Sequence, residues 1–425
     1  MTTNTKTVII GLDGVPFQMI EDFISTGVMP NTARIISDGT FKKMYSSIPE
    51  VSSVAWSSMI TGKNPAEHGI FGFMDTHPNS YKMRFPNYNN LRAEPFWDQW
   101  QGESVIINVP STYPVRTMNG VLISGFVSID FDKSIHPTSL IPVLKDLDYR
   151  LDVDANKAHK AMDLFLADLE ETLEARIRAY QYLWNNFDWQ HFMLVFTGTD
   201  RLMHFLWEAY ENKKHKYHEF FVNHFRRIDQ AIGEIADRLN NDGLLVIHSD
   251  HGFEHLDHEV FINFLLREKG YLQFRTGSEP ALENICFGTR AFAMDPARIY
   301  LNRKGKYPCG TVRDDQAEIL INELTALFDS LEIDGRKVIK HIYRREQIYS
   351  GPYLNEAADL ILVGAKGFNL KSSMKSDKLA DRGIFSGKHT QDTAFLITMG
   401  LPDNSIVPNT PSICDIKGMI EKAQS

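Results

Sequence analysis

Six short, uninterrupted apolar runs constrain the fold of this chain more than any other feature of its sequence. A strand with one face in water alternates apolar and polar residues, whereas a strand of a parallel sheet covered on both faces is apolar throughout. The runs of this second kind are residues 8–12, 105–109, 121–123, 192–196, 244–247 and 360–363. Helical periodicity occurs between them, at residues 161–184, 217–239 and 317–328. This alternation predicts an α/β fold, with a doubly wound, mostly parallel sheet that has helices on both faces.

The composition is that of a globular protein with one large core. Of the 425 residues, 43% are apolar and 23% are charged, which excludes a disordered chain, a collagen and a coiled coil. The formal net charge of −9 argues against a protein that coats nucleic acid. Because no linker rich in Gly and Ser divides the chain, we expect residues 1–425 to form a single core, with lid-like insertions at about residues 73–100 and 254–296.

The cysteines and the first residues of the chain predict a cytoplasmic protein. Three cysteines at wide spacing (Cys286, Cys309 and Cys414) do not make a disulfide scaffold. The first residues are polar and lack the pattern of a secretory signal. No apolar run approaches the roughly 20 residues that span a bilayer, so we expect no membrane span. The sequence does not indicate an oligomeric state.

Acidic residues follow three of the apolar runs. Asp13 follows the first run, Asp200 lies just past residues 192–196, and Asp250 follows residues 244–247. The carboxyl ends of parallel strands meet at one edge of a sheet, where ligands bind. Carboxylates gathered at that edge repel one another unless cations lie between them. Taken singly, each of these residues could instead be a helix N-cap or a turn residue.

Histidines accompany these acids and favour a metal site. His204 lies four residues after Asp200, on the same face if a helix begins there, and His251 directly follows Asp250. His389 lies in a polar loop that contains glycine. A lone histidine is more often structural, but this set has the composition of a mixed nitrogen and oxygen binuclear site, which suits Zn²⁺, Mn²⁺ or Fe.

A serine-rich segment at residues 49–62 predicts a short helix that ends near Gly62. The simpler interpretation makes Ser52 or Ser53 the N-cap of this helix. The same position is chemically useful, because a helix N-terminus stabilises an anion. A serine beside a divalent cation can also ionise and act as a nucleophile.

Together these residues resemble the alkaline phosphatase superfamily, and in particular its type I phosphodiesterase/nucleotide pyrophosphatase branch. The resemblance rests on five units in the family's order, which are residues 10–14, 52–70, 199–204, 249–253 and 387–389. Any one of these units alone is a weak signal. All five in order, spanning nearly the whole chain, are specific.

The resemblance implies a set of site residues and two divalent metal ions, with Zn²⁺ as the first choice and Mn²⁺ or Fe as alternatives. One ion would be held by Asp200, His204 and His389, and the other by Asp13, Asp250, His251 and the Ser52 oxygen. The resemblance also implies that Ser52 attacks phosphorus and forms a phosphoseryl intermediate. Ser53 is the fallback if the register is off by one.

The chain departs from the pyrophosphatase branch at Ala55, where the family has an Asn that donates to a phosphate oxygen. Candidate replacements are the Ser53 backbone N–H, Asn64 and Asn108, although a turn role explains Asn108 better. Trp56 is a candidate contact for an aromatic or apolar leaving group, although such a residue is more often part of a core.

These observations predict a hydrolase that acts on phosphoric ester bonds. The leading interpretation is a metal-dependent phosphodiesterase or nucleotide pyrophosphatase whose substrate is a small phosphoester, including nucleotides as candidates. We expect no stable complex with nucleic acid. The alternatives are a phosphomonoesterase like alkaline phosphatase and, after it, a phosphomutase or a non-catalytic metal-binding homologue.

Overall fold

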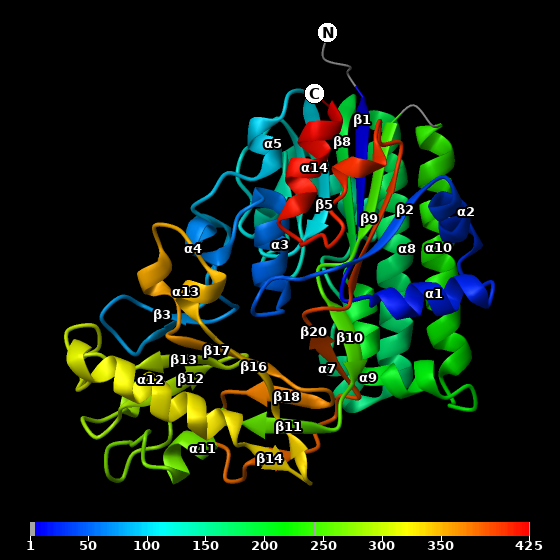
Figure 1. Ribbon diagram of the computed structural model, residues 1–425. Coiled ribbons are helices and arrows are strands. Elements are labelled where there is room, and N and C mark those ends of the chain that lie inside the picture. Colours follow the sequence, from blue (N-terminus) through cyan, green and yellow to red (C-terminus); the bar gives the residue numbers. More distant parts are fainter. Residues whose placement is uncertain (1–4, 241–242, 425) are drawn as a thin grey trace. The chain divides into compact units, whose positions relative to one another are not determined.

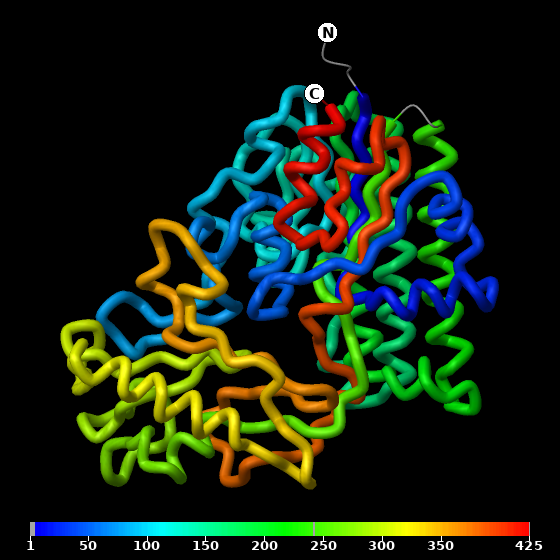
Figure 2. The backbone as a smooth tube through the Cα atoms, in the orientation of Figure 1, coloured from blue at the N-terminus to red at the C-terminus, as the bar shows by residue number. Residues whose placement is uncertain are grey.

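The protein is described by a computed structural model that covers residues 5–240 and 243–424 (Figures 1 and 2). Its contacts divide the chain into two compact units. Of the described residues, unit 1 comprises 5–63, 87–240, 243–253 and 389–424, and unit 2 comprises 64–86 and 254–388. The single core with insertions at about 73–100 and 254–296 stays a prediction. Residues 73–86 and 254–296 belong to unit 2, and residues 87–100 belong to unit 1.

An eight-stranded sheet forms the centre of unit 1. Its strands are β1 (Lys6–Leu12), β2 (Gly39–Met44), β5 (Glu103–Val109), β6 (Gly120–Ser124), β7 (Ile135–His136), β8 (Trp189–Phe196), β9 (Gly243–His248) and β21 (Ala394–Met399). They are ordered β2-β21-β9-β1-β8-β5-β6-β7. The strands from β9 to β6 run parallel, whereas β21 is antiparallel to β9 and β2, and β7 is antiparallel to β6. The predicted mostly parallel sheet is confirmed.

Helices cover both faces of this sheet. The helices of unit 1 are α1 (Phe17–Ser25), α2 (Pro30–Ser37), α3 (Ser52–Thr61), α5 (Phe96–Gln99), α6 (Ile141–Asp146), α7 (Asn156–Lys160), α8 (Met162–Asn186), α9 (Gly198–Glu211), α10 (His218–Leu239) and α14 (Asp415–Gln424). In Figure 1, α3, α5 and α14 lie on one side of the sheet, and α8 and α10 lie on the other. The covering explains why the apolar runs of β1, β8 and β9 are buried along nearly their whole length.

The short helix predicted from the serine-rich segment is α3, and all ten of its residues are buried. It ends at Gly62, which adopts the left-handed backbone conformation with φ of 67°. The prediction that Ser52 or Ser53 caps the helix was wrong. The N-cap is Val51, which has no side-chain cap, and the two serines are the first residues of the helix itself. Their hydroxyl groups are therefore not used to cap α3.

Unit 2 is built mainly from antiparallel strands. A four-stranded sheet has the order β12-β13-β17-β16, and its strands are β12 (Ala291–Met294), β13 (Arg298–Leu301), β16 (Ile339–Arg344) and β17 (Leu360–Gly364). The apolar run at 360–363 forms β17, which pairs antiparallel with β13 and β16. Its assignment to the parallel sheet was therefore wrong, because an apolar run reports burial and not strand direction.

Unit 2 also contains smaller strands and helices outside this sheet. The strands are β3 (Asp75–Thr76), β4 (Met83–Arg84), β11 (His258–Phe261), β14 (Glu332–Ile333), β15 (Arg336–Lys337), β18 (Phe368–Lys371) and β19 (Ala380–Asp381). The helices are α4 (Pro65–His68), α11 (Ile262–Glu268), α12 (Asp314–Asp329) and α13 (Arg345–Ile348). The chain passes between the two units within β10 (Gly252–His255) and β20 (Gly387–Thr390), and again at residues 63–64 and 86–87. The predicted helix at 317–328 corresponds to α12.

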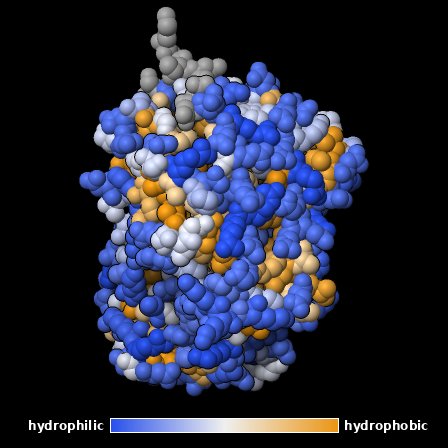
Figure 3. Space-filling view, turned by 90° about the vertical axis from the view of Figure 1, so that its right-hand side faces the viewer, coloured by the Kyte–Doolittle hydropathy of each residue, from blue (hydrophilic) through white to orange (hydrophobic). Residues whose placement is uncertain are grey.

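The face of the protein drawn in Figure 3 is mostly polar. Figure 3 shows one face, on which hydrophilic residues predominate and apolar residues form separate groups. None of the helices within the described residues is both long enough and apolar enough to cross a membrane. The expected cytoplasmic location stays a prediction.

Candidate metal centre and nucleophile

The predicted ligands and the predicted nucleophile all lie in unit 1. Three of the parallel strands, β9, β1 and β8, are neighbours in the sheet, and each is followed at its carboxyl end by one of the acids. The seven residues are Asp13 after β1, Ser52 at the start of α3, Asp200 and His204 on α9, Asp250 and His251 after β9, and His389 on β20. Strand order alone therefore brings the three carboxylates to one edge of the sheet.

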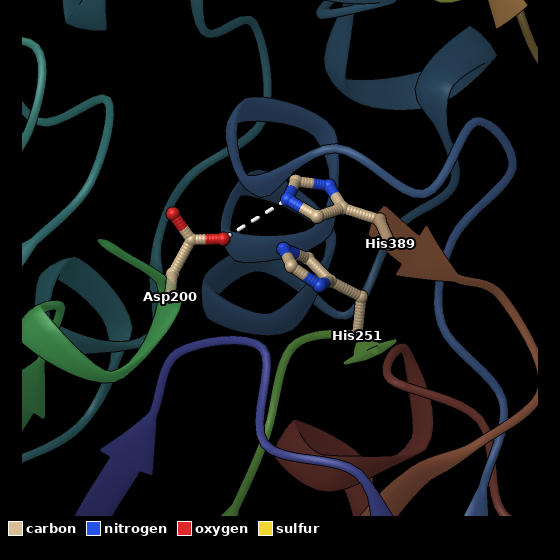
Figure 4. A group of neighbouring side chains, drawn as sticks. All are labelled: Asp200, His251 and His389. Atoms are coloured by element: carbon tan, nitrogen blue, oxygen red, sulfur yellow. Dashed lines mark hydrogen bonds and ion pairs between the residues drawn. The ribbon is translucent and has the colours of Figure 1, made fainter. Parts of the chain in front are cut away.

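The first group of donor atoms consists of Asp200, His204 and His389. Oδ1 of Asp200 lies 2.9 Å from Nε2 of His389 and 3.4 Å from Nε2 of His204. The two imidazole Nε2 atoms are themselves 2.9 Å apart. Figure 4 shows Asp200 and His389 facing each other, with the His251 ring beside the His389 ring. Three potential ligand atoms thus converge on one point.

The second group consists of Asp13, Asp250 and His251, with Ser52 beside it. Nε2 of His251 lies 3.6 Å from Oδ1 of Asp13, 3.4 Å from Oδ2 of Asp250 and 3.3 Å from Oγ of Ser52. Oγ of Ser52 also lies 3.5 Å from Oδ1 of Asp13. Ser53 differs, because its Oγ is buried and has no hydrogen-bond partner among the described residues.

His251 lies close to members of both groups in the structure. Ligand atoms of Asp200, His251 and His389 lie within 4.8 Å of one another, as do those of Asp13, Asp250 and His251. The rings of His251 and His389 stack with their centroids 3.8 Å apart. The sequence indicated the two sets but not that the His251 imidazole connects them.

Backbone carbonyls determine which ring nitrogen of two histidines faces the cluster. Nδ1 of His251 lies 3.1 Å from the carbonyl oxygen of Gly252, and Nδ1 of His389 lies 3.0 Å from that of Glu50. A carbonyl only accepts hydrogen bonds, so we assign the proton to Nδ1 in both rings. In the neutral rings Nε2 then carries a lone pair directed at the cluster, which is the usual arrangement of a metal-ligating histidine.

Each of the three carboxylates has one oxygen held by a group outside the cluster. Nε1 of Trp56 donates to Oδ2 of Asp13 at 3.4 Å, and the backbone N–H of Gly14 donates to Oδ1 of Asp250 at 3.1 Å. Nη1 of Arg201 lies 3.6 Å from Oδ2 of Asp200. The other oxygen of each carboxylate is the one that faces the donor atoms described above. These outer groups restrict the rotation of the carboxylates.

The cluster is electrostatically strained in the absence of added positive charge. Burial raises the pKa of Asp13 well above its usual value, and the charges of Asp250 and Asp200 raise it further. Burial also raises the pKa of Asp250 to about 7, although the hydrogen bond from the backbone of Gly14 lowers it in part. Burial disfavours the ionised form of Asp200 as well, but His204 and His389 hold its pKa well below the usual range. Burial lowers the pKa of His251 and keeps the ring neutral.

A divalent cation fits this donor set. Oδ2 of Asp250 is buried and accepts no hydrogen bond from the described residues, which is costly for a carboxylate oxygen unless it binds a cation. The Nε2 atoms of His204 and His389 lie 2.9 Å apart, a distance at which a proton or a cation must lie between them. Carboxylate oxygen and imidazole nitrogen are the donors that Zn²⁺ and similar ions bind.

The candidate substrate contacts have partners inside the protein. The side-chain N–H groups of Asn64, in unit 2, donate to Oε2 of Glu67 at 2.7 Å and to the carbonyl of Ser350 at 2.8 Å. Those of Asn108 donate to the carbonyl of Val195 and to Oγ1 of Thr197, both at 3.1 Å. Trp56 is fully buried.

Sequence reasoning missed Arg201, although its position next to Asp200 was a usable signal.

Comparison with known proteins identifies the family. The model of the type I phosphodiesterase/nucleotide pyrophosphatase family matches residues 7–392. The chain belongs to this family. It is therefore a hydrolase that acts on phosphoric ester bonds, and the two groups of donor atoms are candidate ligands for the metal on which the family depends. A comparison with curated proteins found no match.

Solved structures of the same fold include bacterial and mammalian enzymes. Phosphonoacetate hydrolase from Sinorhizobium meliloti 1021, in complex with phosphonoacetate, has 17% identity and a TM-score of 0.69, over 100% of this chain and 97% of that chain. An inactive variant of murine ectonucleotide pyrophosphatase/phosphodiesterase 5, in complex with AMP, has 11% identity and a TM-score of 0.59, and the match covers 99% of this chain and 95% of that chain. Human ectonucleotide pyrophosphatase/phosphodiesterase 5 has 13% identity and a TM-score of 0.57, and the match covers 99% of this chain and 94% of that chain. At these identities the likeness establishes the fold, and it confirms the predicted architecture.

Proposed function

We propose that this chain hydrolyses a phosphodiester bond of a small phosphoester, with Ser52 as the nucleophile beside two divalent metal ions. The observation that carries the proposal is the position of the Ser52 hydroxyl group. Its oxygen lies 3.5 Å from Oδ1 of Asp13 and 3.3 Å from Nε2 of His251, at the N-terminus of α3. Since Oγ of Ser53 contacts neither group of ligands, these distances favour Ser52 over Ser53 as the nucleophile.

The residues around Ser52 would hold both ions. Asp200, His204 and His389 would bind one ion, and Asp13, Asp250, His251 and Ser52 would bind the other, with Zn²⁺ as the first choice and Mn²⁺ or Fe as alternatives. When bound, the ions would supply positive charge that stabilises the attacking and leaving oxygens. Three carboxylates and an ionised serine sum to −4, which two divalent ions balance. An anionic substrate would therefore meet a nearly neutral centre, despite the formal net charge of −9 of the chain.

The chain's own residues would carry the covalent steps. The Ser52 oxygen attacks phosphorus in line with the leaving oxygen, and the hydroxyl gives up its proton. A phosphoseryl ester forms, the bond from phosphorus to the leaving oxygen breaks, and that oxygen takes up a proton and departs as an alcohol or nucleoside. Water then attacks phosphorus, the bond to the Ser52 oxygen breaks, and a phosphomonoester is released as the serine regains its proton. Unpaired N–H groups at the start of α3 would hold a non-bridging oxygen. The backbone N–H of Ser53 is the candidate that replaces the Asn absent at Ala55, because the amide hydrogens of Asn64 and Asn108 are used within the protein.

The test compares mono- and diesters on metal-loaded protein. We expect bis(p-nitrophenyl) phosphate to be hydrolysed faster than p-nitrophenyl phosphate in the presence of Zn²⁺ or Mn²⁺. Ser52→Ala should lower turnover of the diester by at least about 10³-fold, whereas Ser53→Ala, which keeps its backbone N–H, should retain far more activity. Failure of the metal-loaded wild-type protein to hydrolyse either ester would lead us to abandon the proposal. Full activity of Ser52→Ala would refute the serine mechanism.

The same assay separates the alternatives. A phosphomonoesterase would show the opposite ratio of monoester to diester turnover. A phosphomonoesterase needs additional positive charge to bind the dianionic terminal phosphate. The nearby guanidinium of Arg201 already pairs with Asp200 and Asp152, so it does not supply this charge. This supports a preference for diesters. Phosphonoacetate belongs in the same panel as a test of C–P bond cleavage. A non-catalytic homologue would bind metal stoichiometrically and hydrolyse none of these compounds.

Asp200 provides a separate test of the metal centre. Asp200→Ala should remove one of two bound ions per chain and abolish turnover, while far-UV circular dichroism stays unchanged. Unfolding of this variant in the absence of metal would instead indicate a structural role for the carboxylate.

A further inference from the structure

Arg201 is a mostly buried arginine that directly follows Asp200 on α9. Its side chain is only 18% exposed. Nη2 donates to Oδ2 of Asp152 at 2.9 Å, Nη1 lies 3.6 Å from Oδ2 of Asp200, and the guanidinium carbon lies 4.0 Å from the centre of the Phe126 ring. All four residues belong to unit 1. The side chain is therefore fixed on two edges by carboxylates and on one face by an aromatic ring.

The two oxygens of Asp200 have different surroundings. Oδ1 lies within 3.4 Å of the Nε2 atoms of His204 and His389, whereas Oδ2 faces Nη1 of Arg201. A carboxylate is planar, so a group that holds one oxygen also sets the direction of the other. Rotation of Asp200 about its terminal bond would carry Oδ1 away from the two imidazoles.

Asp152 argues against positive charge as the contribution of Arg201 to the cluster. The Arg201–Asp152 pair is electrically neutral as a unit, so it adds little net positive charge to the cluster. If arginine were replaced by a neutral residue, Asp152 would be left unbalanced beside the metal site. By charge alone such a variant should bind cations more tightly. By orientation it should bind them less tightly, because Asp200 loses the partner of its outer oxygen. The two explanations therefore predict opposite results.

We infer that Arg201 is a positioning residue that orients Asp200 toward the cation held by Asp200, His204 and His389. The inference rests on the proposed metal centre. It does not make Arg201 a substrate contact, because both of its terminal nitrogens already face carboxylates of the protein. Removal of an outer partner of a metal ligand, here the ion-paired Arg201, typically weakens metal binding about 10–100-fold. We expect an effect of that size at this one position, and little effect at the ion held by Asp13 and Asp250.

The test measures metal affinity and stoichiometry directly. Wild-type protein, Arg201→Met and Arg201→Lys are dialysed to equilibrium against graded Zn²⁺, and bound metal is determined by elemental analysis. Arg201→Met should lose one of two ions at Zn²⁺ concentrations that saturate the wild type. Arg201→Lys keeps a charge but not the planar fork, so it should recover affinity only in part. It also serves as the measured variant if Arg201→Met does not fold.

Arg176 provides a matched control. It is a second buried arginine in unit 1, and its guanidinium donates to the carbonyls of Arg150 and Leu151 and to Oγ1 of Thr197. Arg176→Met should lower thermal stability without changing the affinity for Zn²⁺. This control separates a general loss of stability from a specific loss of ligand orientation.

The outcomes distinguish the inference from the proposed function. If Arg201→Met binds both ions as tightly as the wild type, or more tightly, the positioning role is refuted. Equal weakening in Arg176→Met would also refute it, as would a raised KM for the diester with unchanged Zn²⁺ affinity, which would indicate substrate contact. If the wild-type protein itself binds no Zn²⁺ in stoichiometric amounts, the proposed metal centre fails instead.

Discussion

Replacing Gly11 with alanine should destabilise the protein, because the new methyl group would occupy space taken by the Trp56 indole. A Cβ atom at Gly11 would lie 2.3 Å from Cη2 of Trp56 and 3.1 Å from Cγ2 of Val195. Carbon atoms pack at about 3.5–4.0 Å, so the indole would have to move by about 1 Å. Trp56 is fully buried, and the interior of a protein is close-packed, so the indole can move only by displacing its neighbours. Overpacking of this kind costs about 1–3 kcal/mol, and we expect the free energy of unfolding to fall by about 2 kcal/mol.

The same displacement should reach the metal centre. Nε1 of Trp56 donates to Oδ2 of Asp13 at 3.4 Å, close to the longest distance at which a hydrogen bond forms. A movement of about 1 Å would break this bond and release the carboxylate, whose Oδ1 faces Ser52. Loss of such a partner weakens metal binding about 10–100-fold. We therefore expect Gly11→Ala to bind Zn²⁺ at least about tenfold more weakly than the wild type.

Urea unfolding and equilibrium dialysis measure these two effects, and Gly418 offers a matched control. Gly418 lies within α14, and a Cβ atom there meets no other atom within 4 Å. Gly418→Ala should therefore stabilise the protein by about 0.5–1 kcal/mol and leave Zn²⁺ affinity unchanged. If Gly11→Ala unfolds at the same urea concentration as the wild type, the steric argument is wrong. If it is destabilised but binds Zn²⁺ normally, the link from Trp56 to Asp13 is wrong.

Three further predictions concern stability. Burial lowers the pKa of His224 to about 4, so the folded state binds fewer protons than the unfolded state below pH 6.5, and stability should be lost as the pH falls from there toward 4. Between pH 7.5 and 5 the free energy of unfolding should fall by about 2 kcal/mol because of His224. In His224→Leu this part of the pH dependence of urea unfolding should be absent. If the free energy of unfolding depends on pH in the same way in both proteins, the prediction is wrong. Asp229 accepts hydrogen bonds from the backbone and side chains of Asn31 and Thr32 at 2.7–3.0 Å, so Asp229→Ala should cost about 3 kcal/mol by the same measurement, and a loss below 1 kcal/mol would argue against this link between α10 and α2. A chelator should lower the melting temperature and added Zn²⁺ should restore it, whereas an unchanged melting temperature in protein shown to lose its metal would contradict coupling of metal binding to stability.

The main strands and helices could be predicted because their signals are local. The apolar runs at 192–196 and 244–247 lie inside β8 and β9, and the periodic segments at 161–184 and 217–239 correspond to α8 and α10. Burial on both faces leaves a continuous apolar run, which can be read directly from the sequence. Whether a strand is parallel or antiparallel to its neighbours does not change its local sequence pattern in the same way. For this reason the prediction that residues 360–363 belong to the parallel sheet is wrong, because β17 is antiparallel to both of its neighbours.

The candidate site was predicted in part for a related reason. Acids that follow parallel strands must meet at one edge of the sheet, so Asp13, Asp200 and Asp250 could be grouped before their distances were known. The hydroxyl of Ser52 could not be separated from that of Ser53 by the same means. The two serines are neighbours at the start of one helix, and only the directions of their side chains distinguish them.

By itself, the sequence determined the fold class, the family and the set of residues from which a metal centre can be built, because periodicity and motif order are properties of the chain. Only the tertiary structure decided that the His251 imidazole lies within reach of both groups of donor atoms, and that Trp56 and Arg201 contact the outer oxygens of Asp13 and Asp200. These are contacts between side chains, set by packing and rotamer, and a carboxylate in the sequence does not show which of its oxygens faces a metal ion. The physical reason is that spacing along a chain fixes distances only within one element, whereas a site is assembled across several.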